Sequence, residues 1–321
     1  MFETIAAADL GSQNTRVRAG AKAAFEPTRA ALDPQRPSRI IAVGSETEGL
    51  LNAAFVHPVR GAVAEPEQAA ILLRRVTLRL INRKSLVGVS VAAAAPKAQG
   101  PLALSALVSA CRSAGFRSVA LYDSSACGAL GAGLDIDSPR ASFVADIGRE
   151  TLTTAAVANG GVIRGTASRL GSCRFDSGIR SWFACEQGML LSARMAEAVK
   201  KSLGSPVLRV SGREASGGLT RVRELGSAAL WEALSPHVRE LANEIAAAID
   251  ALPPDAAADL LETGVTLIGG GALMHGLPER LTELLGIPVS RAAEPETAVI
   301  RGLSKLTSLE KGSFTRRAAV V

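Results

Sequence analysis

Apolar runs of strand length alternate along the chain with stretches in which apolar residues recur at helical spacing. In the first half, residues 86–94 and 118–122 are such runs. Residues 67–81 and 102–114 show the helical spacing, and Gly115 directly after the second stretch is typical of a helix C-terminus. This alternation predicts an α/β fold with a parallel-rich sheet and crossover helices.

The rest of the chain is predicted from the same pattern and from its glycines and prolines. A break is expected at Ser235-Pro236, because proline favours the first turn of a new helix. The remaining expected elements are turns over 30–39, a strand over 40–44, a small helix over 45–52, helices over 176–185 and 190–203, a loop with a short strand over 204–220, two helices within 223–251 that Pro253-Pro254 ends, a strand over 263–268, a helix over 272–285, a strand over 287–290, a helix over 295–309 and a frayed tail over 311–321.

A polar turn interrupts the first apolar run. Residues 5–17, IAAADLGSQNTRV, predict a strand, a turn and a second strand. Gly11 lets the backbone approach an anion, Ser12 and Asn14 add side-chain donors, and the N–H groups of consecutive residues in the turn, Gln13 among them, can form an anion-binding nest. Asp9, at the end of the first strand, could hold a water molecule of a metal ion. The alternative is an ordinary hairpin turn, because Asp-x-Gly closes many hairpins.

Two further turns strengthen the first interpretation. Residues 142–154, SFVADIGRETLTT, repeat the apolar run, the Asp-x-Gly and the polar turn, now around Asp146 and Gly148. Residues 265–273 hold a third turn after a β-branched run, and it could pass close to a flat ligand ring. The chain is therefore expected to contain the same strand-turn-strand unit twice, followed by a glycine-rich turn.

Three such turns in this order resemble the actin and Hsp70 ATPase superfamily, and within it the MreB family of bacterial actins that determine cell shape. The segments similar to that family run along the chain: Glu26-Pro27-Thr28, Val43-Gly44, residues 57–63 and 131–134, Arg169-Leu170-Gly171, Phe175-Asp176, residues 210–213 and residues 269–273.

The resemblance implies an α/β, actin/Hsp70-type ATPase fold in which two related domains with mixed sheets enclose a nucleotide cleft. The first domain is expected over residues 1–140, with an outer subdomain over about 28–64. The second is expected over 141–321, with an outer subdomain over about 186–225.

The resemblance also implies ATP or ADP with Mg²⁺ as the ligand. Asp9 and Asp146 would hold the metal through water. The residues expected at the nucleotide are Gly11, Ser12, Gln13, Asn14, Gly148, Arg149, Glu150, Glu197, Lys200, Gly269, Gly270, Gly271, Ala272 and Leu273. Glu197 and Lys200 match a family pair that contacts the ribose and the adenine; the alternative is an exposed ion pair within one helix.

Two segments depart from the family in the half of the site that concerns catalysis. Arg149-Glu150 stand where the family has two glycines. If those glycines are left-handed, each side chain costs about 1–2 kcal/mol unless the turn rearranges. Glu150 would oppose phosphate by about 4 kcal/mol per unit charge at 4 Å and an effective ε of about 20. Arg149 could neutralise that charge or contact a phosphate itself.

The second departure is Ser124, which stands where the family has the glutamate that activates the attacking water. Serine is a poor base at neutral pH, and Asp123 could substitute only if its loop shifted. The alternative is that Asp123 and Ser124 cap the helix that follows. Losing a positioned base lowers a rate by about 10²- to 10⁴-fold, so slow or absent hydrolysis is expected.

The amino-acid composition of the chain limits the kinds of partner that it is expected to bind. The chain has 321 residues, enough for two domains, and a net charge of +6, which suits either an anionic partner or scattered solubilising arginines. Only 3% of its residues are aromatic, which argues against stacking on nucleic acid. The spacing of the four cysteines indicates neither zinc nor disulfides, and the N-terminus lacks a signal-peptide layout.

A cytoplasmic location is therefore expected, with peripheral membrane contact as a second expectation. The N-terminal amphipathic helix of some MreB proteins is not expected here, because residues 1–3 alone precede the first expected strand. Residues 79–86, RLINRKSL, are the candidate for a membrane-contacting loop, and the alternative is a plain loop before a core strand.

The predicted function is a nucleotide-binding, MreB-like actin homologue of cell shape or cell-wall morphogenesis, with weak or absent ATP hydrolysis. Its expected partners are further copies of itself, in a filament, and membrane-associated morphogenesis proteins. The main alternative is a scaffold that no longer binds nucleotide. An Hsp70 would need a large domain beyond Val321, and a sugar kinase would need a catalytic aspartate that does not stand out.

Overall fold

A five-stranded sheet forms the centre of the first half in the computed structural model, which describes residues 4–50 and 53–309. In spatial order its strands are β10 (Val119–Asp123), β9 (Val89–Ala95), β1 (Thr4–Leu10), β2 (Asn14–Ala19) and β3 (Lys22–Pro27). β1, β2 and β3 pair antiparallel, whereas β1, β9 and β10 pair parallel. The sheet is therefore mixed.

A second five-stranded sheet repeats this arrangement. Its strands are β18 (Val289–Arg291), β17 (Val265–Ile268), β11 (Ser142–Ile147), β12 (Leu152–Ala158) and β13 (Gly161–Ser168). β11, β12 and β13 pair antiparallel, and β11, β17 and β18 pair parallel. The same topology in both sheets confirms the prediction that one unit occurs twice in the chain.

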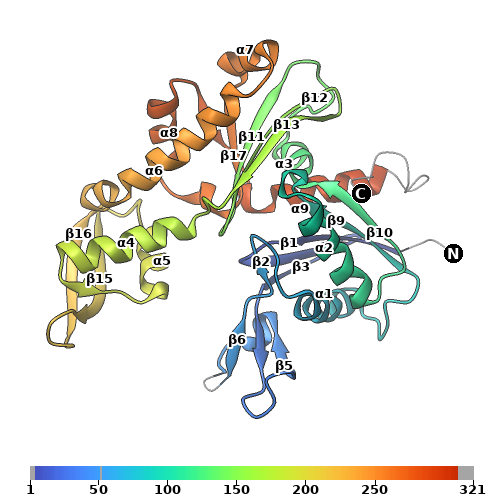
Figure 1. Ribbon diagram of the computed structural model, residues 1–321, viewed down its shortest axis with the longest axis horizontal. Helices are drawn as coiled ribbons and strands as arrows, with labels where there is room; N and C mark the ends of the chain where they lie inside the picture. The colour runs from blue at the N-terminus through green and yellow to red at the C-terminus, as the bar shows by residue number, and fades with distance from the viewer. Residues whose placement is uncertain (1–3, 51–52, 310–321) are drawn as a thin grey trace.

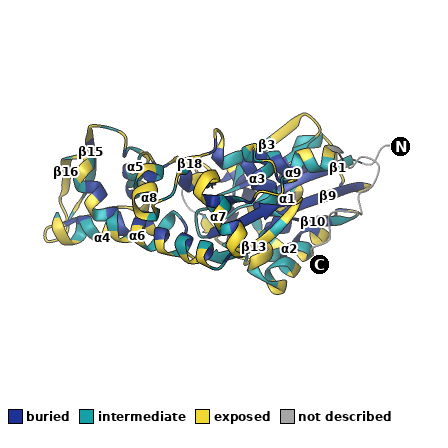
Figure 2. Ribbon diagram, turned by 90° about the horizontal axis from the view of Figure 1, so that it is seen from above, coloured by how far each residue is buried: buried dark blue, intermediate teal, exposed yellow. Residues whose placement is uncertain are grey.

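Helices cover both faces of the first sheet (Figure 1). α1 (Pro66–Ile81) and α2 (Pro101–Ala114) lie on one face, and α9 (Ala298–Leu309) lies on the other. Successive strand residues point to opposite faces, so Val91 packs towards α1 and α2 while Ala92 packs towards α9. All of β9 is buried for this reason (Figure 2).

The second sheet is also covered on both faces. On one face a single hydrophobic core joins it to α4 (Cys173–Glu186), α6 (Ser227–Asp250), α7 (Pro254–Thr263) and α8 (Leu277–Leu285). On the other face α3 (Ser124–Ala132) packs through Ala129 against Val144 of β11.

α3 and α9 cross between the two sheets with their backbones in close contact (Figure 1). A Cβ atom at Gly131 of α3 would overlap the carbonyl oxygen of Ala298 of α9. A Cβ atom at Gly302 of α9 would overlap the carbonyl oxygen of Cys127 of α3 in the same way. Glycine at both positions is therefore what allows the two helices to approach so closely.

Smaller sheets and short helices complete the fold. The small sheet of the first half contains β5 (Ile40–Val43), β4 (Ala30–Leu32) and β6 (Ala54–Val56), and that of the second half contains β14 (Met189–Leu190), β15 (Val207–Glu214) and β16 (Thr220–Gly226). The other elements are the two-stranded sheet of β7 (Val59–Arg60) and β8 (Ala62–Val63), helix α5 (Ala193–Lys201), and the 3₁₀ helices η1 (Gly44–Thr47), η2 (Lys97–Gln99), η3 (Gly270–Leu273) and η4 (Pro295–Thr297).

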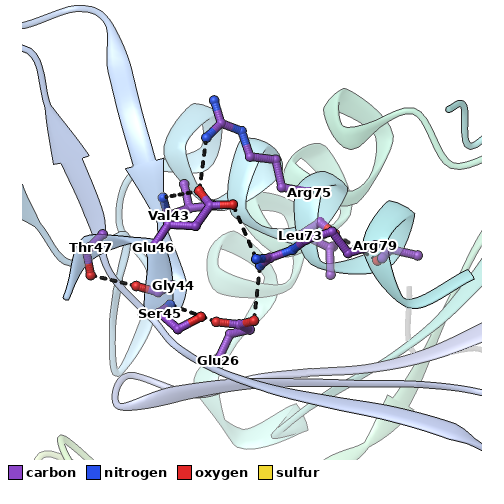
Figure 3. Close-up of polar contacts among 10 residues, drawn as sticks. Glu26, Val43, Gly44, Ser45, Glu46, Thr47, Leu73, Arg75 and Arg79 are labelled. Atoms are coloured by element: carbon purple, nitrogen blue, oxygen red, sulfur yellow. Dashed lines mark hydrogen bonds and ion pairs between the residues drawn. The ribbon is translucent and has the colours of Figure 1, made fainter. Parts of the chain in front are cut away.

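Charged residues join strand β3 and the 3₁₀ helix η1 to helix α1 (Figure 3). Glu46 of η1 lies 3.3 Å from Arg75 and 3.2 Å from Arg79, both on α1. Arg79 also lies 3.1 Å from Glu26 of β3, and Glu26 accepts a hydrogen bond of 2.7 Å from the N–H of Ser45. We call these five residues the Glu26 clasp, because they join β3, η1 and α1.

The predicted break at Pro236 was wrong. α6 continues through this proline as one helix, and residues 220–226, expected to be partly helical, form β16. A proline inside a helix costs about 3 kcal/mol. Leu234 and Val238, on either side of Pro236, are buried in the same core, and burying such side chains contributes about 1.5–3 kcal/mol each. Packing therefore outweighs the local preference of proline.

Other elements differ from expectation in extent. Residues 30–32, expected to be turns, form β4, and residues 204–220 contain most of a long hairpin. α6 ends at Asp250, before Pro253-Pro254, as expected. A separate helix that was not expected, α7, then begins at Pro254, because its missing N–H is not needed in a first turn.

Three further boundaries are corrected. The helix expected over 190–203 is preceded by β14 and spans Ala193–Lys201, and the helix expected over 272–285 divides into η3 and α8. The small helix after β5 is the single turn η1; the end of the predicted range, residues 51–52, and the expected frayed tail over 311–321 lie outside the described residues. No helix in the described ranges is long and apolar enough to span a membrane.

Candidate functional site

The three predicted turns meet around one cavity of about 700 Å³ between the two large sheets. Most residues expected at the ligand line it: Asp9, Gly11, Ser12, Gln13, Asn14, Ser124, Asp146, Gly148, Arg149, Glu197, Lys200, Gly269, Gly270, Gly271 and Leu273. Asp123, Glu150 and Ala272 do not line it. Segments far apart in the sequence therefore contribute to one concave site, as ligand sites usually require.

The first two turns have the same backbone geometry. The N–H of Gly11 donates to the carbonyl of Asn14 at 3.1 Å, and the N–H of Gly148 donates to the carbonyl of Thr151 at 2.9 Å. Both turns directly follow the strands β1 and β11, which occupy equivalent positions in the two sheets. The folding pattern of the two halves therefore brings both turns to the same cavity.

The third turn packs on the second through its glycines. Cβ atoms at Gly269 or Gly271 would overlap Ile147. A Cβ atom at Gly270 would have no heavy atom within 4 Å, so this residue faces open space in the cavity. Of the three glycines, Gly270 is the one that a flat ring could approach.

The second turn accommodates Arg149 and Glu150 without left-handed backbone. Among the described residues, Asn82 and Asn159 are the non-glycine residues with positive φ, so neither Arg149 nor Glu150 carries the expected conformational cost. The Glu150 carboxylate lies 4.0 Å from the Cys173 sulfur and does not line the cavity. Its expected repulsion of phosphate is thereby reduced.

Glu197 and Lys200 do not pair with each other. Lys200 Nζ lies 2.7 Å from the Asp176 carboxylate, and both side chains are buried, with 12% and 10% exposure. Glu197 instead pairs at 2.7 Å with Lys201, one turn further along α5. Burial raises the pKa of Glu197, but the hydrogen bond and charge of Lys201, with Arg149 and Lys200 nearby, lower it to below its ordinary value.

Asp123 caps helix α3. Its Oδ1 atom accepts the N–H groups of Ser125 and Ala126, and its Oδ2 atom accepts the N–H of Lys97. Ser124 is the first residue of the helix and lines the cavity as a buried side chain. The hydroxyl of Ser124 is therefore at the site, whereas the Asp123 carboxylate is occupied by backbone groups.

Asp9 and Asp146 lie on the floor of the cavity, close to each other and to Arg16. Arg16 Nη1 donates to Asp9 Oδ2 at 3.1 Å. Burial raises the pKa of Asp9, which Arg16 partly offsets. Burial and the charge of Asp9 raise the pKa of Asp146 to about 7, although Arg16 acts in the opposite direction.

The Mg²⁺ that the sequence led us to expect stays a prediction, and Asp9 and Asp146, which both line the cavity, are the residues that would hold it through water. Asp9 already carries a guanidinium, and that cation also acts on Asp146. Arg16 would oppose a second cation by about 4 kcal/mol per unit charge at 4 Å and an effective ε of about 20, whereas each ionised carboxylate would attract it by a similar amount. Within residues 4–50 and 53–309, no group of three or more His, Cys, Asp or Glu side chains could hold a metal ion.

Three charged residues that line the cavity, Arg16, Lys201 and Glu296, were not predicted, and neither was Asp176, the partner of Lys200. Arg16 stands directly opposite Asp9 in the β1–β2 pairing, a relation that follows from the length of the turn between them. Asp176 belongs to a segment similar to the family, but its pairing with Lys200 joins α4 to α5 and has no local signal. Arg16 could have been found from hairpin register, and Asp176 could not.

Comparisons with known proteins agree along most of the chain. A model of the MreB/Mbl protein family matches residues 3–313. The cell shape-determining protein MreB of Escherichia coli (strain K12) is 29% identical over 324 residues, which covers 95% of this chain and 93% of that protein. The cell shape-determining protein Mbl of Bacillus subtilis (strain 168) is 26% identical over 94% of this chain and 95% of its own length.

Solved structures share the fold. MreB5 of Spiroplasma citri bound to AMPPNP superposes with a TM-score of 0.88 at 24% identity, covering 96% of this chain and 97% of that one. A MamK double helical filament gives a TM-score of 0.78 at 16% identity, covering 95% and 98%. The fold is therefore that of the actin-like ATPases.

Proposed function

This chain belongs to the MreB/Mbl protein family, and on that premise we propose that it is a nucleotide-binding actin homologue that acts in determining cell shape. The observation that carries the proposal is the meeting of three turns, two of them equivalent, around one cavity in a chain that matches the family over residues 3–313. The names of the relatives support the role in cell shape.

The ligand we propose is ATP or ADP. Related structures hold AMPPNP and ADP, and the cavity has a size that suits a nucleotide. A thermal melt with and without ADP tests this directly, because a ligand that binds the folded state raises the melting temperature. A shift with ADP but not with adenosine would support the phosphate-binding turns. No shift at saturating nucleotide would favour the alternative, a scaffold that no longer binds nucleotide.

We further propose that hydrolysis is weak or absent. Ser124 supplies a hydroxyl at the cavity, which is a poor base, and the Asp123 carboxylate is occupied in capping α3. Ser124→Glu alone should increase the hydrolysis rate little. The triple variant, which adds Arg149→Gly and Glu150→Gly, should increase that rate by more than the separate changes combined, because groups that act on one transition state couple. Single-turnover phosphate release measures this, and rapid release by the unaltered protein would refute it.

Assembly into filaments is the second part of the proposed function. The MamK relative, whose structure is a double helical filament, shares the fold along 95% of this chain. Sedimentation and electron microscopy of the protein with ATP, ADP and no nucleotide test for filaments. A protein that stays monomeric in all three conditions at high concentration would contradict this part while leaving nucleotide binding intact.

We also propose that the protein is cytoplasmic, that it contacts the membrane surface, and that it acts with membrane-associated morphogenesis proteins. In the candidate loop, Leu86 is buried and Arg79 is held in the Glu26 clasp, so these two residues are occupied. Arg83 and Lys84 are exposed, and the next apolar residue, Val87, is 81% exposed. Co-sedimentation with anionic vesicles should be lost in Val87→Asp if this loop contacts lipid. Unchanged binding by that variant would exclude the loop.

A further inference from the structure

Gln99 of η2 lies where the first and second turns of the cavity come together. Its Nε2 atom donates to the carbonyl of Gly61 at 2.8 Å, and the N–H of Gly61 donates to the hydroxyl of Ser12 in the first turn, also at 2.8 Å. A Cβ atom at Gly61 would lie 3.0 Å from the methyl group of Thr151 in the second turn. All four residues line the cavity. The Gln99 amide is therefore held beside both turns.

This amide keeps hydrogen-bonding capacity. The bond to Gly61 fixes which end of the amide is nitrogen, because a carbonyl oxygen can only accept. The nitrogen carries a second N–H, and the amide oxygen is an acceptor. Within residues 4–50 and 53–309 the side chain of Gln99 makes no other hydrogen bond. One donor and one acceptor are thus available at the wall of the cavity.

The strand order places Gln99 at the end of the cavity opposite the third turn. In the second sheet β17, which leads into the third turn, pairs with β11; the second turn joins β11 to β12, and β13 lies beyond β12. η3 packs against β17, whereas η2 packs against β13. A nucleotide with its base at Gly270 and its phosphates at the second turn would therefore direct its terminal phosphate towards Gln99.

We propose that Gln99 binds the terminal phosphate of a nucleoside triphosphate through its second N–H, so that the site prefers a triphosphate to a diphosphate. The inference rests on the proposed nucleotide-binding function and deepens it, because it names a residue that distinguishes the two ligands. A hydrogen bond to a charged phosphate is stronger than one between neutral groups. The bond to Gly61 orders the amide before the ligand binds, which lowers the entropic cost of binding.

Calorimetry of the full chain with AMPPNP and with ADP, both in excess MgCl₂, tests the proposal. Gln99→Leu removes both polar groups at similar size and should weaken the binding of AMPPNP by about tenfold to a hundredfold, the range for a lost hydrogen bond to a charged group. Its affinity for ADP should change by less than about threefold, because ADP has no third phosphate, and ADP binding also shows that the variant is folded.

Three outcomes are distinguishable. An equal loss for both nucleotides in Gln99→Leu would show that Gln99 only supports Gly61, which would overturn the inference and leave the proposed function standing. Unchanged affinity for AMPPNP in that variant would overturn the inference in the same way. Binding of neither nucleotide by the unaltered protein would overturn both.

Two further variants identify the group responsible. Gln99→Glu keeps the acceptor, loses the donors and adds a negative charge, so it should weaken AMPPNP binding more than Gln99→Leu does. If Gln99→Glu bound AMPPNP as tightly as the unaltered protein, the terminal phosphate would not lie at this side chain. Ala98→Ser, at the exposed neighbouring residue of η2 that does not line the cavity, is the matched control and should bind both nucleotides like the unaltered protein.

Discussion

Lys200→Met should destabilise the protein even when no nucleotide is present. The substitution removes the ammonium group that lies 2.7 Å from Asp176 and leaves a carboxylate that is only 10% exposed. Removing one partner of a buried ion pair costs about 3–5 kcal/mol, because the other charge stays buried and unpaired. Arg149, 4.0 Å from the same carboxylate, remains, so a loss near the lower limit of about 3 kcal/mol is expected.

Lys201→Met is the matched control. Lys201 is the next residue of α5 and pairs with Glu197 at the same distance of 2.7 Å, but its side chain is 69% exposed. Exposed pairs one helical turn apart contribute about 0.3–0.5 kcal/mol. The two lysines are adjacent and undergo the same change, so the contrast isolates burial as the cause.

Urea unfolding of the nucleotide-free variants measures the difference. The two tryptophans of the chain, Trp182 and Trp231, lie on α4 and α6, so their fluorescence reports on the half of the molecule that holds the pair. The double variant Asp176→Asn with Lys200→Met should recover most of the stability, because no buried charge remains. If Lys200→Met lost less than about 1 kcal/mol, as Lys201→Met is expected to, burial would not make the Lys200–Asp176 pair more important for stability than an exposed pair.

Three further predictions concern the cavity and the helix crossing. Gly270→Val should abolish ADP binding without lowering the melting temperature of the free protein, because the valine side chain would enter open space in the cavity. Glu150→Gly should leave the affinity for ADP equal or higher. Calorimetry that gives the opposite order would contradict the assignment of the site. The pKa of Asp146 is raised to about 7 from 3.8, so the folded state binds this proton more tightly than the unfolded state. The stability that this group contributes is present at acid pH and falls as the pH rises from about 4 to 7. Asp146→Asn should therefore flatten that part of the plot of unfolding free energy, measured in urea, against pH. Gly131→Ala should lower stability by at least about 1–3 kcal/mol, seen in a thermal melt, because its Cβ would overlap the carbonyl of Ala298, and an unchanged melting temperature would show that α3 and α9 can separate freely.

The parts of the fold that were predictable from sequence have local signals. Asp-x-Gly after an apolar run marked both hairpin turns, and the helical spacing of 67–81 marked α1 to within one residue. The resemblance to the MreB family added the two-fold organisation and the mixed sheets, which the structure shares. These features depend on neighbours in the sequence or on motifs, and the sequence contains both.

The parts that were not predictable depend on contacts between distant segments. Nothing near Pro236 shows that α6 continues, because burial of Leu234 and Val238 in the core of the second half decides it. Spacing alone suggested that Glu197 pairs with Lys200, but Asp176 on another helix competes for that lysine. The chemistry of the candidate site therefore depends on tertiary partners more than on the motifs that revealed the site.

The Glu26 clasp has a consequence for how this sequence can change over evolution. Gly44, between β5 and Ser45, has a φ of +62°, and a Cβ atom there would lie 2.5 Å from Glu26 Oε2. Any side chain at position 44 would push this carboxylate away from Arg79 and from the Ser45 N–H. The contacts of Glu26 therefore require glycine at position 44, and Glu26 in turn pairs with Arg79. Across homologues the three positions should therefore covary, so that a substitution at one of them is expected to be accompanied by substitutions at the others.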